Sequence, residues 1–372
     1  KRCVIFVTEA ILLVGGYGTR LKPLTIHTPK PMLEVAGFSV TSHQIAKAKK
    51  ANINHIVLGT AFKAEVFKEK LGDGSSLGVQ LSYAFEPEQL GTGGGIRNAA
   101  ALLKSGPEDP IVVFNGDVLS GVNIEKVLKI WKEKNADVAL YLTKVKNPKA
   151  YGLVPTDEAG NVLAFLEKPE KDEDIVTDQI NAGMYIFKRK IIDTIQTGRV
   201  VSVEREVFPN LLKNNYKVIG VVDESYWLDL GTPNAFVKGS CDLVTGKIET
   251  GLIKNHSEKI IEVSAQIDEN VLISNGSYVG NNSKIGKNSK IDSSVISSQV
   301  KIGMNCVIKS SIIAKNVIIE DNCVIENSVI ADSVVLGSES ILKNDSRIWP
   351  DQKVGKVLLD HQTIPEVANW QN

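Results

Sequence analysis

Several residue patterns are missing from this 372-residue chain, and each absence excludes a class of protein. The four cysteines form no CxxC pair and the five histidines form no HxxxH or HExxH pair, so a disulfide framework and a histidine-built metal site are disfavoured. No apolar run reaches the ~18 residues of a membrane span. Lys and Arg number 43, as do Asp and Glu, and this balance excludes bulk electrostatic capture of nucleic acid or acidic membrane. An anionic ligand must therefore be held by a local arrangement of charge.

The beginning of the sequence superficially resembles a signal peptide. Lys1 and Arg2 precede the apolar run from Cys3 to Val14. Glu9 interrupts that run, and a glycine loop follows it in place of an A-x-A cleavage site. We therefore expect a soluble, cytoplasmic protein with reduced cysteines.

A second pair of absences marks the C-terminal part of the chain. No proline occurs between Pro233 and Pro350, and no arginine occurs between Arg205 and Arg347. Aliphatic residues recur there six apart, at Ile267, Ile273, Val279, Ile285 and Ile291. Hexapeptide periodicity is typical of a parallel β-helix, in which each coil has three short faces.

The period then becomes 17 residues, or three hexads with one residue missing. Three copies align, at 291–307, 308–324 and 325–341, with Ile302, Ile319 and Leu336 in one equivalent row. We expect the aliphatic rows to stack inside the coils and the polar residues to face outwards. Cys306 and Cys323 are 17 apart and should stack as small corner residues equivalent to Ser340, a disulfide or metal clip being the alternative.

The preceding part of the chain alternates between strand-like and helix-like runs. Strands are predicted at 10–14, 55–60, 79–85 and 111–114, and helices at 43–51, 62–71 and 96–104. This order predicts an open α/β sheet, whose ligands lie outside the carboxyl ends of the strands. We expect a catalytic domain of Rossmann-like, mostly parallel mixed sheet over residues 1–250, a β-helix over 251–350 and a tail over 351–372.

The most informative segment lies at the first strand end, over residues 15–31 (the signature segment). It begins Gly-Gly-Tyr-Gly-Thr-Arg-Leu, and glycines after a strand let backbone N–H groups cradle a phosphate. Neither a Walker A nor a GxGxxG pattern is present, so the glycines alone favour a tight turn. Arg20, Lys22 and Lys30 add three cations, and three prolines stiffen the connection. Clustered charge on a stiff loop indicates an anion site.

These residues resemble the signature of the sugar-1-phosphate nucleotidyltransferases, GGxGTRLxPLT followed by PKP. Later pieces occur in the family's order: Gly91–Ile96, Asn115–Asp117, Tyr151-Gly152, Glu167–Pro169, Asn181–Gly183 and Trp227–Pro233. A left-handed hexapeptide β-helix also follows the catalytic domain in many members. Within the family, GTGGGIRN, NGDVLSG and YWLDLGTP are most similar to mannose-1-phosphate guanylyltransferases.

The resemblance implies attack by mannose 1-phosphate on the α-phosphorus of GTP, with Mg²⁺ as cofactor. Arg20 and Lys30 would act in catalysis, and Asp117 and Asp229 would converge on the metal. The nucleotide-binding candidates are Gly15, Gly16, Gly18, Thr19, Gly91 and Thr92. The sugar-phosphate candidates are Gly152, Glu167, Lys168 and Asn181.

Each candidate also has a structural interpretation. Asp117 could cap a following helix, and Asp229 could be a turn residue before Gly231. Lys168 and Glu167 could be ordinary surface residues, and Asn181 could bond local backbone. The glycines from 91 to 95 could form a flexible connection, and His27 is interpreted as loop filler.

The sequence departs from the family pattern at a few positions. Tyr17 and Lys22 replace commoner side chains without removing charge, and the stretch 37–40 lacks the proline of the usual Gly-x-Pro turn. The nine residues before Ala10 exceed the usual length ahead of the first strand. The local turn after Met32 is the feature that these departures put in question.

Other functions remain open at this point. The same reaction could use dTTP or UTP with glucose 1-phosphate, or the chain could be a non-catalytic regulatory homologue. An acyltransferase would need a histidine in the coils, and none occurs between 267 and 342. We expect the β-helix to support a homo-oligomer instead, with neither nucleic acid nor membrane as a partner.

Overall fold

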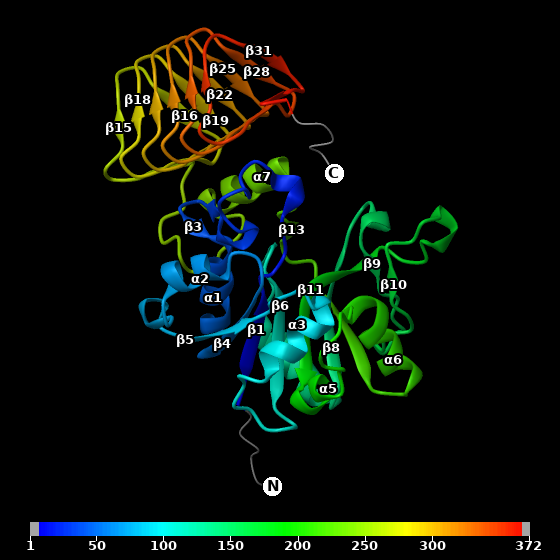
Figure 1. The fold of residues 1–372 in the computed structure, drawn as a ribbon. Coiled ribbons are helices and arrows are strands. Elements are labelled where there is room, and N and C mark those ends of the chain that lie inside the picture. Colours follow the sequence, from blue (N-terminus) through cyan, green and yellow to red (C-terminus); the bar gives the residue numbers. More distant parts are fainter. Residues whose placement is uncertain (1–6, 367–372) are drawn as a thin grey trace. The chain divides into compact units, whose positions relative to one another are not determined.

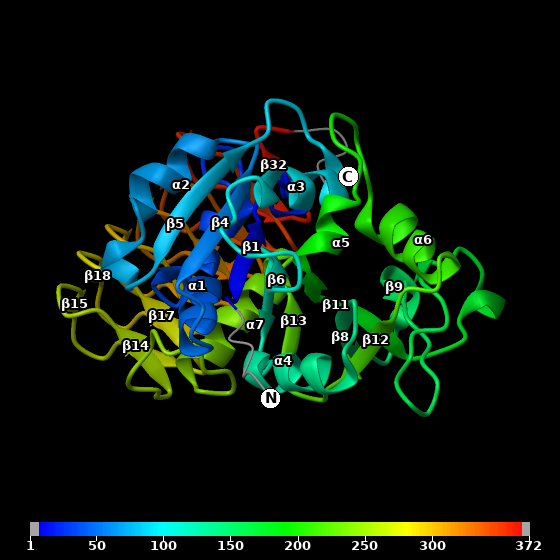
Figure 2. The same cartoon turned by 90° about the horizontal axis from the view of Figure 1, so that it is seen from below.

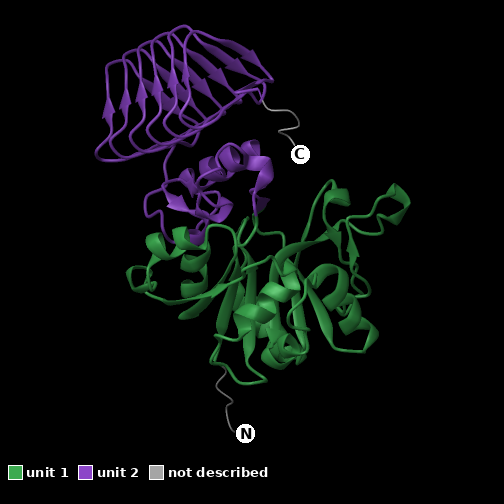
Figure 3. Cartoon of the chain, viewed as in Figure 1, with its two compact units in different colours: residues 1–16, 44–227 green, residues 17–43, 228–372 purple. Residues whose placement is uncertain are grey.

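The computed structural model describes residues 7–366, so Cys3 and the last residues of the predicted tail lie outside the described residues. The chain divides into two compact units, each built from separated segments (Figure 3): unit 1 contains residues 1–16 and 44–227, and unit 2 contains residues 17–43 and 228–372. Unit 2 thus combines most of the signature segment with the β-helix. The predicted boundary at 250 stays a prediction.

A mixed sheet of nine strands forms the centre of unit 1 (Figures 1 and 2). Its main path runs β10-β9-β11-β6-β1-β4-β5, and β8 joins β11 to β12. Parallel pairs link β6, β1, β4 and β5, whereas β11 runs antiparallel to β6 and β8. The strands are β1 (Glu9–Leu13), β4 (His55–Thr60), β5 (Gln80–Phe85), β6 (Pro110–Asn115), β8 (Val138–Lys144), β9 (Gly152–Leu153), β10 (Leu166–Glu167), β11 (Gln179–Lys188) and β12 (Val218–Val222). The predicted α/β sheet is confirmed.

Seven α-helices accompany the strands of the described chain. They are α1 (Val40–Lys50), α2 (Ala64–Leu71), α3 (Gly91–Ala100), α4 (Ile124–Lys134), α5 (Arg189–Asp193), α6 (Phe208–Lys213) and α7 (Pro233–Val244). The three predicted helices match α1, α2 and α3. Helix α3 begins five residues earlier than predicted, because the glycines at 91 and 93–95 are part of the helix. In unit 1, α3 and α5 lie on one face of the sheet and α4 lies on the other (Figure 2).

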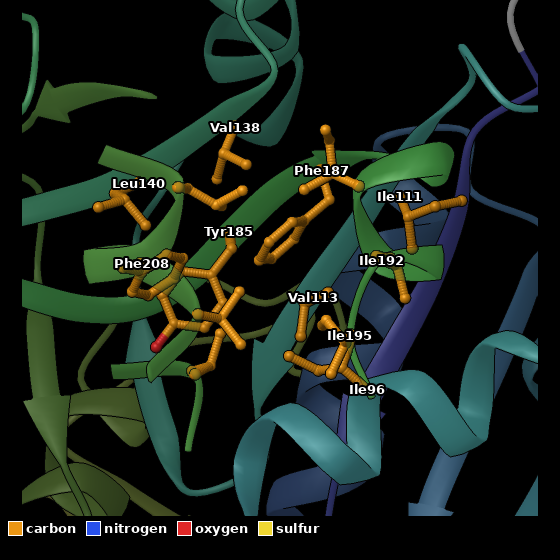
Figure 4. Close-up of a cluster of buried hydrophobic side chains, with 14 of the residues drawn as sticks. Ile96, Ile111, Val113, Val138, Leu140, Tyr185, Phe187, Ile192, Ile195 and Phe208 are labelled. Atoms are coloured by element: carbon orange, nitrogen blue, oxygen red, sulfur yellow. The ribbon is translucent and has the colours of Figure 1, made fainter. Parts of the chain in front are cut away.

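The core of unit 1 lies between the sheet and the helices α3 and α5. Aromatic rings of Tyr185, Phe187 and Phe208 gather there, with centroids 5.1 Å apart for Tyr185 and Phe208 and 6.0 Å apart for Phe187 and Phe208 (Figure 4). Ile96 of α3 and Ile192 of α5 are buried in the same cluster. Burial of this apolar surface fixes the strands whose ends carry the candidate residues.

The C-terminal part of unit 2 is a parallel β-helix with three sheets, one for each face of the coil (Figure 1). The first face contains β14 (Lys259–Ile261), β17 (Ser277–Val279), β20 (Val295–Ile296), β23 (Ile312–Ile313), β26 (Val329–Ile330), β29 (Arg347–Ile348) and β32 (Thr363–Ile364). The second contains β15 (Gln266–Ile267), β18 (Lys284–Ile285), β21 (Lys301–Ile302), β24 (Ile318–Ile319), β27 (Val335–Leu336) and β30 (Lys353–Val354). The third contains β16 (Leu272–Ser274), β19 (Lys290–Asp292), β22 (Val307–Lys309), β25 (Val324–Glu326), β28 (Ile341–Lys343) and β31 (Leu358–Asp360).

The strand register confirms the predicted 17-residue coil. Ile291, Ile308 and Ile325 stack on one another, and Ile302, Ile319 and Leu336 form the predicted row. The spacing is 18 between the first coils and varies between the last ones, from 18 at Val329 and Arg347 to 16 at Arg347 and Thr363. The coils continue beyond residue 350 through β30, β31 and β32, where the sequence predicted a tail.

The turns of the coils explain why Asn and Ser are abundant in this part of the chain. Asn288, Asn305 and Asn322 adopt φ of 60°, 56° and 59°, a left-handed conformation that asparagine tolerates well. Their amides form a ladder, with Nδ2 to Oδ1 distances of 3.2 Å between successive coils. Cys306 and Cys323 occupy buried corners and are free thiols, which confirms the corner interpretation over the disulfide.

Glu9, which interrupts the apolar N-terminal run, has a structural role in unit 1. Its carboxylate is 2% exposed and accepts bonds from the backbone N–H groups of Lys104 and Ser105 and from His55 Nδ1. Burial raises the pKa of this carboxyl, but the bonds outweigh burial and hold the pKa below its usual 4.5.

No helix within residues 7–366 combines the length and apolarity that crossing a membrane requires.

We predict that Glu9→Gln lowers the free energy of unfolding by about 1–3 kcal/mol at neutral pH, because the charged acceptor is lost. Because the pKa of Glu9 is lower in the folded than in the unfolded protein, the ionised carboxylate stabilises the fold above pH ~4.5. This stabilisation is lost as the pH falls through the pKa of the folded state. The difference from wild type should therefore shrink as the pH falls below 4.5 towards the lowered folded-state pKa. Urea denaturation across this pH range measures it, with Glu69→Gln on the exposed side of α2 as control. A difference that persists at low pH would contradict the assignment.

Candidate active site

Gly18 fixes the shape of the signature segment in unit 2. Its φ is 61°, and a Cβ at this position would lie 2.7 Å from Cβ of Lys30. Thr25 Oγ1 donates to the Gly18 carbonyl at 3.0 Å. Positive φ and close approach both require glycine here. The segment therefore folds back on itself, which brings Lys30 beside the glycine turn that also carries Thr19 and Arg20.

A carboxylate lies between the two predicted catalytic cations. Asp229, at the end of β13 (Trp227–Asp229), has Oδ1 3.7 Å from Lys30 Nζ and Oδ2 3.8 Å from Arg20 Nη2. The Lys30 side chain is 9% exposed, whereas that of Arg20 is 59% exposed and can turn towards a ligand. A turn residue would not have gathered both cations, so this geometry favours a site role for Asp229.

Gly231 belongs to this cluster and was not among the predicted site residues. A Cβ there would lie 2.5 Å from Arg20 Nη2 and 3.0 Å from Asp229 Oδ2. The close approach of the guanidinium to the carboxylate therefore requires glycine. The signal that could have identified Gly231 as a site residue is its position two residues after Asp229.

The turn after Met32 is a two-residue hairpin between β2 (Glu34–Val35) and β3 (Phe38–Ser39). Ala36 and Gly37 occupy its centre with φ of 47° and 85°, as a type I′ turn requires. Ser39 then accepts from the N–H of Ser42 at the start of α1. The hairpin leads into the helix without the family's proline.

In unit 1, the predicted strand-end residues lie where the parallel strands β1 and β6 finish side by side. Gly116 donates to the Leu13 carbonyl at 2.9 Å, and a Cβ at Gly116 would lie 2.5 Å from that oxygen. Gly15 follows β1 and accepts from Gln89 Nε2, and Gly16 is exposed. Asp117 precedes β7 (Val118–Ser120), and the cap of α4 is Asn123, so the capping interpretation of Asp117 is wrong.

Gly91 and Thr92 begin α3 and pack against residues 199–204, so they are not a flexible connection. A Cβ at Gly91, whose φ is 71°, would lie 2.6 Å from the Val201 carbonyl. Thr92 Oγ1 donates to Glu204 Oε2 at 2.7 Å and accepts from the N–H of Val203. The glycines therefore serve close packing of this helix, and a nucleotide role for them stays a prediction.

Gly152 and Glu167 face each other across the antiparallel pair β9 and β10. A Cβ at Gly152 would lie 2.6 Å from Glu167 Oε2 and 2.9 Å from the Phe165 ring, so glycine makes room for the carboxylate. Burial first, and then the nearby charge of Glu204, raise the pKa of Glu167. Glu204 was missed by the sequence reasoning because no motif contains it.

Lys168 and Asn181 differ in how strongly the fold restrains them. Lys168 has φ of 49° and a 62% exposed side chain, with Nζ 3.8 Å from Glu167 Oε1. Asn181 accepts from the N–H of Gly183 at 3.0 Å and donates to the Tyr185 hydroxyl at 2.8 Å. The local-bonding interpretation of Asn181 is thus correct for one of its atoms, while the lysine ammonium is accessible to a ligand.

Three motif pieces of unit 1 meet through Trp227 and Gly183. The Trp227 ring packs edge-on against Tyr151 with centroids 5.3 Å apart, and its Nε1 donates to the Ala182 carbonyl at 3.0 Å. A Cβ at Gly183 would lie 3.1 Å from Asn115 Nδ2. Motifs that lie far apart in the sequence are therefore neighbours in this unit.

No group of three or more His, Cys, Asp or Glu side chains within residues 7–366 could hold a metal ion unaided. Magnesium does not need such a group, because it takes one or two carboxylates and completes its octahedron with phosphate oxygens and waters. Asp117 and Asp229 are carboxylates of that kind, and their assignment as ligands stays a prediction.

Solved structures share the nucleotidyltransferase fold. A putative glucose-1-phosphate thymidylyltransferase from Bacillus anthracis, in complex with a sucrose, aligns with a TM-score of 0.56 at 20% identity over 63% of this chain and 94% of that chain. HddC from Yersinia pseudotuberculosis, complexed with GMP-PN, aligns with a TM-score of 0.53 at 25% identity over 63% of this chain and 98% of that chain.

Curated relatives cover more of the sequence. A mannose-1-phosphate guanylyltransferase from Mycobacterium tuberculosis is 47% identical over 290 residues, which are 77% of this chain and 79% of the relative. A mannose-1-phosphate guanylyltransferase catalytic subunit beta from Drosophila melanogaster is 35% identical, over 63% of this chain and 62% of the relative.

Two family models match the chain. Residues 256–358 match the model of the EIF2B subunit epsilon LbH domain, which assigns the left-handed form to the β-helix. Residues 9–246 match the nucleotidyl transferase model and include every predicted site residue. The chain therefore belongs to the nucleotidyltransferase family, as an NDP-sugar pyrophosphorylase of the mannose-1-phosphate guanylyltransferase group with a C-terminal left-handed β-helix.

Proposed function

We propose that this protein transfers a guanylyl group from GTP to mannose 1-phosphate, which forms GDP-mannose and releases pyrophosphate. The observation that carries the proposal is the arrangement of Lys30 and Arg20 around Asp229 on a glycine turn. The chain has no net charge, so this local pair of cations is what can attract a triphosphate. The relatives' shared name supports the choice of GTP and mannose 1-phosphate.

The chemistry requires little covalent help from the protein. A phosphate oxygen of mannose 1-phosphate attacks the α-phosphorus of GTP in line with the departing pyrophosphate, so positioning and charge stabilisation dominate. Arg20 offsets the negative charge that develops on the departing pyrophosphate. Its side chain is 59% exposed and can therefore reach a bound triphosphate. Lys30, held by Gly18 and Asp229, supplies a fixed positive charge.

Magnesium is part of the proposal as the cofactor that neutralises phosphate charge and orients the α-phosphate. Asp117 and Asp229 would supply its protein ligands. Asp229 would place the metal beside the two cations, and the phosphates of the substrates would offset the positive charge gathered there.

The sugar phosphate is assigned to the cluster around β9 and β10. Lys168 would bind the phosphate, because its ammonium is exposed beside Glu167. Glu167 and the backbone at Gly152 would bind sugar hydroxyls, and Asn181 would hold the Gly183 turn in place.

A substrate panel tests the proposed reaction. We expect pyrophosphate release to be fastest with GTP and mannose 1-phosphate among four nucleoside triphosphates and several sugar 1-phosphates. Faster turnover with dTTP or UTP and glucose 1-phosphate would overturn the guanylyl assignment. Tight binding of GDP-mannose without any turnover would indicate a regulatory homologue instead.

We predict that Asp117→Asn and Asp229→Asn each lower kcat by roughly 100-fold or more, because a charged metal ligand is replaced by a neutral one. The Mg²⁺ concentration for half-maximal activity should rise in both variants. Pyrophosphate release during Mg²⁺ titration measures this, and Asp351→Asn in an exposed turn of the β-helix is the matched control. An unchanged Mg²⁺ requirement in either variant would remove that residue from the metal site.

We propose further that the protein is a cytoplasmic homo-oligomer assembled through the third face of the β-helix. The three cysteines within residues 7–366 are free thiols, which supports a reducing compartment. On this face, side chains at equivalent positions of successive coils point out of the β-helix and form an outward row. The row is mostly aliphatic, and its members in register order are Leu272, Lys290, Val307, Val324, Ile341 and Leu358. Leu272 and Leu358 are 60% and 68% exposed.

Charges beside this row alternate in sign from coil to coil, at Asp292, Lys309, Glu326, Lys343 and Asp360. A second copy in the opposite direction, offset by one coil, would meet this ladder with opposite charges. Aliphatic surface with self-complementary charge is the kind of face that two copies can share.

We expect Val324→Glu to reduce the oligomer to smaller species, because a carboxylate would be placed in the middle of the aliphatic row. Light scattering after gel filtration measures the mass of the full-length protein. Ile318→Glu, 36% exposed on the second face, is the control and should leave the mass unchanged. If both variants keep the wild-type mass, the third face is not the interface.

A further inference from the structure

An outward row on the first face of the β-helix is buried, unlike the outward row on the third face. Its members in register order are Tyr278, Val295, Ile312, Val329, Arg347 and Thr363 (the covered row). Each is less than 9% exposed, although the next residue of each strand is the one that points into the coil. Another part of the chain must therefore cover this face.

The cover includes the segment that carries the predicted catalytic residues. At one end of the row, a Cβ at Gly37 would lie 2.6 Å from the Tyr278 hydroxyl oxygen. At the other end, Arg347 Nη1 donates to the carbonyl oxygen of Arg20 at 3.0 Å and also to that of Lys22. The first face of the β-helix thus contacts residues 20–37 within unit 2.

Arg347 is the only charged member of the covered row, and its charge is fully engaged. Its side chain is 4% exposed, and Nε and Nη2 donate to the two carboxylate oxygens of Asp345 at 2.9 and 3.0 Å. The carboxylate holds one edge of the planar guanidinium, which leaves the other edge to bind the two loop carbonyls. A buried charge is retained only where such bonds replace its hydration.

The bonded carbonyls belong to the turn that carries the catalytic cation. Thr19–Leu21 form a single 3₁₀ turn, which isolated from other contacts has little stability of its own. Fixing the carbonyls on both sides of Leu21 fixes the backbone from which the Arg20 side chain extends towards Asp229. Arg20 itself is largely exposed, so its position depends on this backbone.

An ion pair also joins the β-helix to the segment after Met32, but it is more exposed than the contacts of Arg347. Lys315 Nζ lies 2.6 Å from Glu34 Oε1, but the two side chains are 40% and 30% exposed. Exposed pairs of this kind contribute little. A lysine in place of Arg347 would also be a point charge, unable to bind Asp345 and two carbonyls with one rigid plane.

We propose that Arg347 is a positioning residue, through which the C-terminal coils of the β-helix hold the signature segment in its active conformation. The catalytic part of this proposal rests on the proposed function, whereas the conformational part does not. Activity would then depend on the integrity of coils that bind no substrate.

Hydrogen exchange tests the conformational part without any substrate. In Arg347→Met, which keeps an unbranched apolar side chain but removes the guanidinium, we expect the non-proline backbone amides of residues 19–26 to exchange about tenfold faster or more. Amides of α4 in unit 1 should be unchanged, which separates loss of the loop anchor from general destabilisation. Lys353→Met, exposed on the neighbouring second face, is the matched control. Unchanged exchange in residues 19–26 of Arg347→Met would overturn the proposal.

Steady-state kinetics tests the catalytic part. We expect kcat of Arg347→Met to fall about 10- to 100-fold, since small misplacements of catalytic groups have effects of this size. The KM for mannose 1-phosphate should stay within about twofold, because a positioning defect of Arg20 acts on the transition state. Arg347→Lys should recover part of kcat, and Asp345→Asn should show a smaller loss in the same direction.

The possible outcomes are distinct. Faster exchange without a kinetic defect would show that the anchor holds the loop but is not needed for turnover, which overturns the positioning role. Equal losses in Arg347→Met and Lys353→Met would also overturn it. If wild type shows no turnover with GTP and mannose 1-phosphate, the proposed function fails while the exchange result still decides the conformational part. If Arg347→Met does not fold, Asp345→Asn provides both measurements.

Discussion

The carboxylate of Asp229 between Lys30 and Arg20 is the interaction on which the candidate site depends. Lys30 is almost buried, and an opposite charge beside a buried ammonium offsets the loss of its hydration. Two glycines make this approach possible, because a side chain at Gly18 would displace Lys30 and one at Gly231 would displace Arg20. The spacing of glycines and cations in the signature motif therefore has a physical reason. It places one carboxylate between two cations, which offsets one of the two positive charges and leaves a net positive charge for a phosphate.

The β-helix adds a constraint of a different kind. Its 17-residue coil repeats the same three faces, so substitutions in a single coil change one position of a long row. The interior rows are aliphatic throughout, whereas the outward rows differ between faces. On the first face the outward row is buried, and on the third face it is partly exposed. A regular scaffold can thus present one face to the rest of its own chain and another to a further copy.

Sequence reasoning predicted the periodic features well and the non-local contacts poorly. The strand at His55–Thr60 and the row from Ile302 to Leu336 follow directly from local periodicity. Glu204 could not be found, because its proximity to Glu167 depends on how the segment 199–207 packs against α3. Helix α3 was predicted to begin late, because a run of glycines opposes helix formation and only close packing against Val201 explains it. The division into units was also hidden, since unit 2 draws its segments from both ends of the catalytic region.

The absence of arginine between 205 and 347 acquires a meaning from the covered row. The aliphatic members Val295, Ile312 and Val329 pack without any need for polar partners, and a charge among them would be costly. Arg347 breaks the row at the coil where the signature segment passes, and Asp345, two residues earlier, supplies the matching carboxylate. A charge placed in a buried row at only this coil is best explained by what it binds. The neutral net charge of the chain thus conceals two local arrangements: the cluster of Arg20, Lys30 and Asp229, and a buried arginine that bonds the backbone of that cluster.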